Sequence, residues 1–281
     1  MSNNLVIKFE GSMAEQHIVP AYNAAQAIAG ITRSIMIPAA YLEHGKIKHR
    51  NLTKTRAFQL NLLAQREGSF ETLIDFIIKN EFLLGVGVGV TIDLVKDFIY
   101  SLIRRCIGEK ADANSTIEEL EAADKLKSGD LTALVEVLEP PIKMAHNIIN
   151  NGANNVFIIH GDRNVVTLNS ETKRFVNTSI EGEILLVKEF SVGSFNANTG
   201  NGRVFDYSEG RTVPFKLDSA ADGATINVLM DSLKYYARKK RLDDESRSRV
   251  ALQYKSITAP DERIKKIVVF KARTGMDDLI K

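Results

Sequence analysis

The chain has 281 residues, of which 44% are hydrophobic and 26% charged, and its formal net charge is +2. This composition excludes a disordered chain and allows two domains with separate cores. The single cysteine, Cys106, excludes an intrachain disulfide and the cysteine-rich zinc patterns. The first residues lack the basic start and apolar core of a secretory signal, so we expect a cytoplasmic protein.

The first 79 residues predict a strand, a long helix and a hairpin. Residues 5–10 alternate as a strand does, and residues 21–43 repeat apolar side chains at helical spacing, with a kink or interruption expected at Pro38. Residues 57–65 and 69–79 both alternate, and the Arg-Glu-Gly turn between them predicts a β-hairpin.

A basic loop separates the long helix from this hairpin. It carries five cationic side chains: Lys46, Lys48, Arg50, Lys54 and Arg56. Clustered cations attract phosphate groups, so the loop is a candidate nucleic-acid-binding segment.

Residues 82–103 are apolar at most positions and about as long as a membrane span. They include Asp93, Lys96 and Asp97, whose spacing places all three on one face of a helix. A soluble amphipathic helix near residues 90–107 is therefore the better interpretation, and we expect no membrane span.

No motif in the chain predicts a cofactor, a metal or catalysis. The glycine-rich segment at residues 85–89 fails the dinucleotide fingerprint because position 90 is valine, and no Gly-Lys-Ser/Thr follows it. The histidines are not at metal-ligand spacing: His17, His44, His49, His146 and His160. We therefore assign no catalytic or metal residues and expect no cofactor, although a site assembled from distant residues stays open.

The middle of the chain predicts helices and then a second hairpin. Ser115-Thr-Ile-Glu118 is a capping box that begins a short helix, and residues 131–139 predict another that ends at Pro140-Pro141 before a further helix to Gly152. The asparagine- and glycine-rich turn at residues 150–155 indicates a domain boundary nearby. Residues 156–160 and 165–168 then predict a hairpin.

From residue 183 the pattern becomes rich in strands. Strands are predicted at residues 184–196, 203–207, 212–217, 250–258 and 264–272, with a helix at 225–241 after the third. This is the order of elements in the five-stranded OB barrel, and an SH3-like barrel or an open sheet would give a similar list. The sequence therefore predicts an α+β protein with a mixed helix and hairpin domain at 1–152, a hairpin and connecting segment at 153–182, and a small β-barrel-like domain at 183–281.

A second basic cluster ends the helix of this last domain, where Arg238, Lys239 and Lys240 follow Tyr235 and Tyr236. Cations at a helix C-terminus are also favoured by the helix dipole. Phosphate binding and helix-end electrostatics therefore explain the cluster equally well.

The stretch from Gly193 to Phe205, followed by Gly210-Arg-Thr-Val-Pro-Phe215, resembles the first three strands of cold-shock domains. That family stacks single-stranded bases on exposed aromatic side chains. The resemblance implies Phe205, Tyr207 and Phe215 as stacking candidates with Arg203 beside them, and core packing is the alternative for at least two of the three rings.

Over nearly its whole length, chiefly in residues 190–212 and 263–273, the chain also resembles a family of bacterial proteins of unknown function, which implies a bacterial origin and no activity.

The first functional hypothesis is a non-enzymatic binding or scaffold protein that forms a homo-oligomer and recognises a partner through its C-terminal barrel. It is based on the lack of catalytic motifs and on apolar segments, at residues 156–159 and 82–90, that we expect a monomer not to cover fully. The alternatives are a single-stranded nucleic-acid-binding protein that uses the barrel and the basic loop, and an enzyme with an unrecognised site. The partner is accordingly a protein or a single-stranded nucleic acid.

Overall fold

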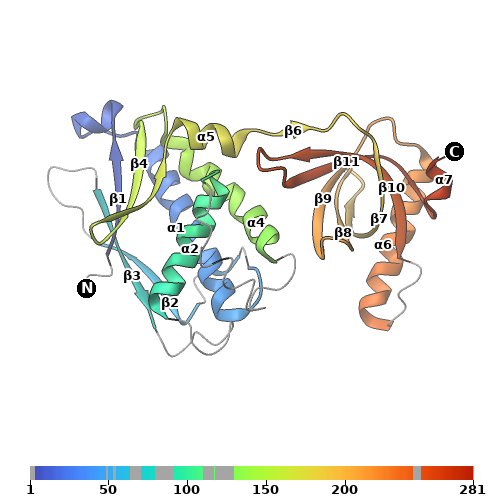
Figure 1. Ribbon diagram of the computed structural model, residues 1–281, viewed down its shortest axis with the longest axis horizontal. Coiled ribbons are helices and arrows are strands. Elements are labelled where there is room, and N and C mark those ends of the chain that lie inside the picture. The colour runs from blue at the N-terminus through green and yellow to red at the C-terminus, as the bar shows by residue number, and fades with distance from the viewer. Residues whose placement is uncertain are drawn as a thin grey trace. The chain divides into compact units, whose positions relative to one another are not determined.

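The computed structural model describes residues 4–48, 50–52, 55–63, 71–79, 91–109, 117, 130–242 and 248–280. The chain divides into two compact units, Met1–Asn177 and Thr178–Lys281. Figure 1 shows helices beside a sheet in the first unit and a curved, closed set of strands with a long helix in the second. The predicted fold class, α+β with a small barrel at the C-terminal end, is confirmed.

An antiparallel five-stranded sheet forms one layer of the first unit, in the order β2-β3-β1-β4-β5. In β1, Leu5 and Ile7 are fully buried, whereas Lys8 is partly exposed. Such alternation is typical of a sheet with one face against the core. The strands are β1 (Asn4–Glu10), β2 (Phe58–Leu62), β3 (Glu71–Ile78), β4 (Asn155–His160) and β5 (Arg163–Leu168).

Helices form the second layer and share one hydrophobic core with the buried face of the sheet (Figure 1). Helix α1 continues through Pro38, and α4 continues through Pro140 and Pro141, so the predicted interruption and helix end are wrong. Burial explains the continuity of α1, because Ile37 and Ala39 on either side of Pro38 are 0% exposed and this packing offsets the cost of an interior proline. The helices are α1 (Ala21–His44), α2 (Ile92–Cys106), α4 (Asp130–Ala145) and α5 (Ser170–Asn177), with the short 3-10 helices η1 (Ser12–Gln16) and η4 (His146–Ile148).

The hairpin β4–β5 is present, but its predicted place in a connecting segment is wrong. Strand β4 pairs antiparallel with β1, with Ile158 opposite Ile7. Val156 and Ile158 are at most 1% exposed and belong to the core, whereas Phe157 and Ile159 are partly exposed, so residues 156–159 are half covered within the first unit. The first unit therefore extends to Asn177, and the turn at residues 150–155 lies inside it.

Three other predictions concern residues outside the described part of the chain: the glycine-rich segment at 85–89, the apolar segment at 82–90, and Ser115 and Glu118 of the capping box. The helix expected near residues 90–107 is confirmed as α2. Its N-cap is Thr91, whose hydroxyl accepts a hydrogen bond of 3.2 Å from the Leu94 N–H.

The second unit is a closed five-stranded barrel (Figure 1). Its strands are β7 (Leu186–Asn196), β8 (Asn201–Asp206), β9 (Arg211–Leu217), β10 (Arg249–Thr258) and β11 (Ile264–Arg273). The pairs β7–β8, β8–β9, β11–β10 and β10–β7 are antiparallel, and β9–β11 is parallel. Because β10 returns to β7, the open-sheet alternative is excluded.

One long helix, α6 (Gly223–Leu242), joins the third and fourth barrel strands, as predicted. The two-residue strand β6 (Ile180–Glu181) pairs with the end of β10, and the short helix α7 (Asp277–Ile280) follows β11. Inward-facing apolar residues of all five strands fill the barrel, among them Phe190, Val204 and Phe215, each at most 1% exposed.

Candidate functional site

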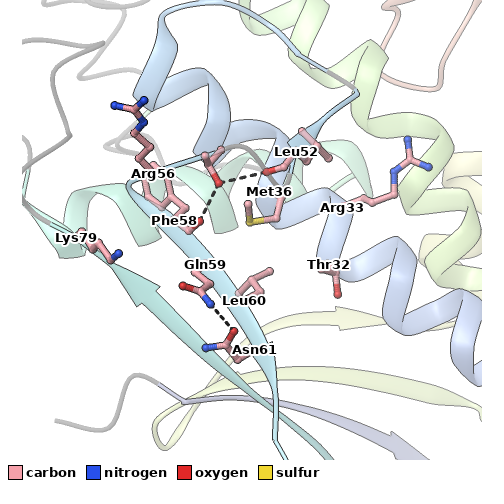
Figure 2. A pocket seen from close by; sticks show the side chains of 11 residues that line it. Thr32, Arg33, Met36, Leu52, Arg56, Phe58, Gln59, Leu60, Asn61 and Lys79 are labelled. Carbon is pink, nitrogen blue, oxygen red and sulfur yellow. Dashed lines mark hydrogen bonds between the residues drawn. The ribbon is translucent and has the colours of Figure 1, made fainter.

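A pocket of about 760 Å³ opens in the first unit, beside α1 and β2 (Figure 2). Its apolar lining consists of Met36, Leu52, Phe58 and Leu60. Its polar lining consists of Thr32, Arg33, Thr55, Arg56, Gln59, Asn61 and Lys79. A concave site of this size with an apolar surface and a few polar groups is typical of small-molecule binding.

Glu43, near the end of α1, holds the loop that borders this pocket. Its two carboxylate oxygens accept hydrogen bonds of 2.9 and 3.1 Å from the Arg56 N–H, and one also accepts from the Ala57 N–H at 3.2 Å. Thr55 Oγ1 donates to the Phe58 carbonyl at 2.8 Å. These bonds tie the entry into β2 to the end of the helix and thereby place Arg56 at the pocket.

The charged side chains among the described lining residues of the pocket are all cationic. Arg33 comes from α1, Arg56 from the loop, and Lys79 from the residue after β3. All three are exposed, and none forms an ion pair with a carboxylate in the part of the chain that the structure describes. The pocket therefore offers many hydrogen-bond donors and a positive charge to a ligand.

A second candidate site is the outer surface of the barrel around Arg203, Phe205, Tyr207 and Arg249, here called the aromatic face. On β8, Val204 and Asp206 point into the barrel and are at most 1% exposed, so Arg203 and Phe205 point outward. The ring centroids of Phe205 and Tyr207 are 5.2 Å apart at an interplanar angle of 84°. Both rings thus belong to one edge-to-face pair on the outside of the barrel.

Neighbouring strands fix the position of Tyr207. Its hydroxyl lies 2.6 Å from Ser191 Oγ on β7, and the guanidinium of Arg249 on β10 lies 4.3 Å from its ring centroid. Arg249 also lies 3.8 Å from the carboxylate of Glu189. The aromatic face is consequently an ordered arrangement of rings and guanidinium groups.

Asp206 holds the turn that carries Tyr207. Its carboxylate lies 2.7 Å from Lys188 Nζ and accepts hydrogen bonds from Ser208 and from the Glu209 N–H. Burial acts to raise the pKa of Asp206, but the hydrogen bonds from Lys188, Ser208 and Glu209 outweigh it and lower this pKa below its ordinary value. The carboxylate is therefore ionised at neutral pH and stabilises the turn.

The structure separates the predicted nucleic-acid-binding residues into different places. Lys46, Lys48, Arg50 and Arg56 are exposed in the loop after α1, and Lys54 lies outside the described residues. Arg203 is exposed and Phe205 and Tyr207 are half-buried on the aromatic face. Arg238 is exposed on α6, whereas the side chains of Lys239 and Lys240 are outside the described part.

Phe215 is a correction to the predicted stacking residues. It is 1% exposed, and its ring stacks on Phe195 inside the barrel at a centroid distance of 5.9 Å. The alternation of β9 directs Val213 and Phe215 inward, so Phe215 cannot contact a base. Core packing thus accounts for one of the three aromatic candidates, rather than for at least two.

Sequence reasoning missed Arg33, Lys79 and Arg249. Arg33 had a usable signal, because it is the only charged residue between Ala21 and Leu42. Lys79 and Arg249 had no local signal, since each acquires its role from side chains of other elements.

Neither a metal site nor a membrane-spanning helix is found in the described ranges. Among the residues placed by the structure, no three His, Cys, Asp or Glu side chains gather to hold a metal ion. None of the described helices is long and apolar enough to cross a membrane.

The fold defines the class of protein as α+β, with a sheet-and-helix unit followed by a small closed barrel. Residues 5–177 match the family described as "Domain of unknown function (DUF7946)", and because this match covers more than half of the chain, the chain belongs to that family. Residues 185–273 match the "Family of unknown function (DUF7947)". No curated protein and no solved structure matched the chain.

Proposed function

We propose that this chain is a non-enzymatic binding protein whose C-terminal barrel recognises its partner through the aromatic face. The observation that supports this most directly is the placement of Phe205, Tyr207 and Arg249 on the outside of a barrel whose interior is already filled. Aromatic rings and arginine side chains dominate the binding energy of protein interfaces. The aromatic face has this chemistry where a partner can reach it.

The contacts of Tyr207 lower the cost of binding. Its hydroxyl is held by Ser191, and Arg249 lies between its ring and Glu189. Side chains that are already ordered lose little conformational entropy when a partner arrives. The face is therefore preorganised for recognition.

The proposal includes self-association. Exposed apolar residues just before β7 and at its start support this part of the proposal. Ile184 is 73% exposed, Leu185 47% and Leu186 42%, a run of three neighbouring apolar side chains. Such patches mark interaction surfaces. Light scattering coupled to size-exclusion chromatography tests self-association. The double variant Ile184→Ser with Leu185→Ser should have a lower molar mass in solution than the wild type, closer to that of a monomer. A monomeric wild type would contradict self-association.

Site-specific photocrosslinking tests the proposed binding face. A benzophenone side chain at position 205 should give a discrete crosslinked product in cells, whereas the same group at the exposed position Met230 on α6 should not. Arg249→Ala should weaken that product. Equal products from both positions, or none from position 205, would contradict recognition through this face.

A single-stranded nucleic acid is the second candidate partner. The closed barrel has the element order of the OB barrel: three strands, a helix and two strands. OB barrels bind oligonucleotides on their second and third strands. Phe205 and Arg203 lie on the second strand, and the exposed Lys46, Lys48 and Arg50 could contact phosphates.

Fluorescence anisotropy with a labelled oligonucleotide tests this second candidate. Phe205→Ala should cost roughly 1–3 kcal/mol of binding free energy through lost stacking. Replacing Lys46, Lys48 and Arg50 with Ala should flatten the salt slope by about 0.7 for each lost phosphate contact. Circular dichroism melting controls for unfolding, and no binding at low salt by the folded wild type would leave a protein as the partner.

A further inference from the structure

The pocket beside α1 has a charge pattern that points to a definite class of ligand. Arg33, Arg56 and Lys79 line it from three different elements, and none of the described lining residues is a carboxylate (Figure 2). A cationic ligand would be repelled, whereas a negatively charged one would be attracted. The pocket is therefore complementary to an anion.

The number and kind of the cations favour phosphate over a single carboxylate. An arginine guanidinium binds phosphate oxygens in pairs, and a lysine ammonium adds a point charge. Figure 2 shows Arg33 on one side of the pocket and Arg56 and Lys79 on the other. A doubly charged phosphate group presents enough acceptor oxygens for donors that arrive from several directions.

The rest of the lining requires an organic group on that phosphate. Leu52 and Leu60 are partly exposed, and together with the buried Phe58 and Met36 they give the pocket an apolar surface. Inorganic phosphate alone would leave this surface in contact with water. A compact apolar or aromatic body would bury it and gain hydrophobic free energy.

The uncharged polar side chains of the lining can orient such a body. Gln59 Nε2 donates to Asn61 Oδ1 at 2.8 Å, which leaves the remaining amide groups of both side chains available to a ligand. Thr32 Oγ1 donates to the Ile28 carbonyl at 2.7 Å and can still accept a hydrogen bond. The site thus combines a charge anchor, a hydrophobic contact and directional hydrogen bonds.

We propose that the pocket lined by Arg33, Arg56 and Lys79 binds a small organic phosphate, in which a phosphate group is joined to a compact apolar or aromatic body. The site lies in the first unit and is independent of the aromatic face. Two sources share this chemistry: a nucleotide, whose body is a base and a sugar, and an alkyl phosphate, whose body is a short hydrocarbon chain.

Isothermal titration calorimetry on the full chain, with five probes, tests the proposal and separates these sources. The probes are ADP, adenosine, hexyl phosphate, hexanol and inorganic phosphate. ADP or hexyl phosphate should bind, and its phosphate-free counterpart and inorganic phosphate should each bind at least about tenfold more weakly. Binding of ADP alone identifies a nucleotide site, and binding of hexyl phosphate alone identifies an alkyl phosphate site.

Two variants and a matched control locate the binding. Arg33→Ala and Lys79→Ala should each weaken the affinity about tenfold, because each removes a charge-assisted hydrogen bond. Arg163→Ala removes a positive charge from the exposed surface of β5, outside the pocket lining, and should leave the affinity unchanged. Thermal melting of each variant confirms that it is folded.

The proposal is overturned if neither organic phosphate binds at millimolar concentration, or if adenosine or hexanol binds as well as its phosphorylated counterpart. It is also overturned if folded Arg33→Ala and Lys79→Ala bind as tightly as the wild type. A loss of affinity in Arg163→Ala equal to that in Arg33→Ala would show nonspecific attraction to surface charge and would likewise overturn it. None of these outcomes bears on the aromatic face.

Discussion

His146 is a completely buried titratable residue that joins two helices of the first unit. Its Nδ1 lies 2.7 Å from the Ile142 carbonyl and its Nε2 lies 2.8 Å from Thr172 Oγ1. A carbonyl can only accept, so the neutral ring carries its proton on Nδ1 and accepts a hydrogen bond at Nε2. His146 therefore links the end of α4 to α5 as a neutral side chain.

The pKa of His146 is lowered from 6.5 to about 4, chiefly because burial disfavours the charged ring. The hydrogen bond to Ile142 acts to raise this pKa, and the positive charge of Lys173 acts to lower it. Between these two values the unfolded chain binds a proton that the folded chain does not. The free energy of unfolding should therefore fall as the pH decreases through this window, by about 3 kcal/mol in total from this residue.

Urea unfolding of the full chain at pH 7 and pH 4.5 measures this effect. In His146→Gln the difference in unfolding free energy between the two pH values should be smaller than in the wild type by about 2 kcal/mol. His17→Gln, at an exposed position, should leave the difference unchanged. An identical pH dependence in His146→Gln and the wild type would contradict the assigned role of the buried ring.

At the scale of elements, helices α1 and α4 of the first unit approach each other closely at Gly30. A Cβ atom added at Gly30 would lie 2.5 Å from both the Ala145 nitrogen and the Pro141 carbonyl oxygen. These are backbone atoms and cannot move aside as a side chain can. The contact also explains why α4 is held as one helix across its two prolines, since α1 packs directly against that segment.

Gly30→Ala should destabilise the first unit by about 1–3 kcal/mol, because overpacking outweighs the gain in helix propensity of about 1 kcal/mol. Gly223→Ala is the matched control: a Cβ there meets nothing within 4 Å, so it should not reduce stability. Thermal unfolding of the two variants compares them directly. Equal stability of Gly30→Ala and the wild type would show that the two backbones separate readily.

Local periodicity predicted the elements well because it reports which residues of one strand or helix face the core. All five barrel strands and α6 lie where alternation and helical spacing indicated them. Pairing between distant strands, such as β1 with β4, leaves no local pattern, and therefore the hairpin was assigned to the wrong part of the chain. The pocket was missed for the same reason, since Arg33, Arg56 and Lys79 line one pocket only in the folded chain.

At the scale of the whole molecule, the strand pairing of β1 determines where the first unit can end. Strand β1 lies between β3 and β4, so the sheet needs residues from both ends of Met1–Asn177. The hydrogen bond between His146 and Thr172 adds a second link to the last helix. A chain that ended near Gly152 would lose β4, β5 and α5 together.

Three fragments test this division of the chain. The fragments Met1–Asn177 and Thr178–Lys281 should each unfold cooperatively on heating, because each contains its own complete core. A fragment of residues 1–152 should not, since it lacks Val156, Ile158 and Leu168 of the core and leaves one edge of β1 without its partner strand. Circular dichroism melting and amide proton dispersion in NMR spectra provide the measurement. A cooperative transition in the 1–152 fragment, or an unfolded Thr178–Lys281 fragment, would show that the two units are not the independent folding domains of this protein.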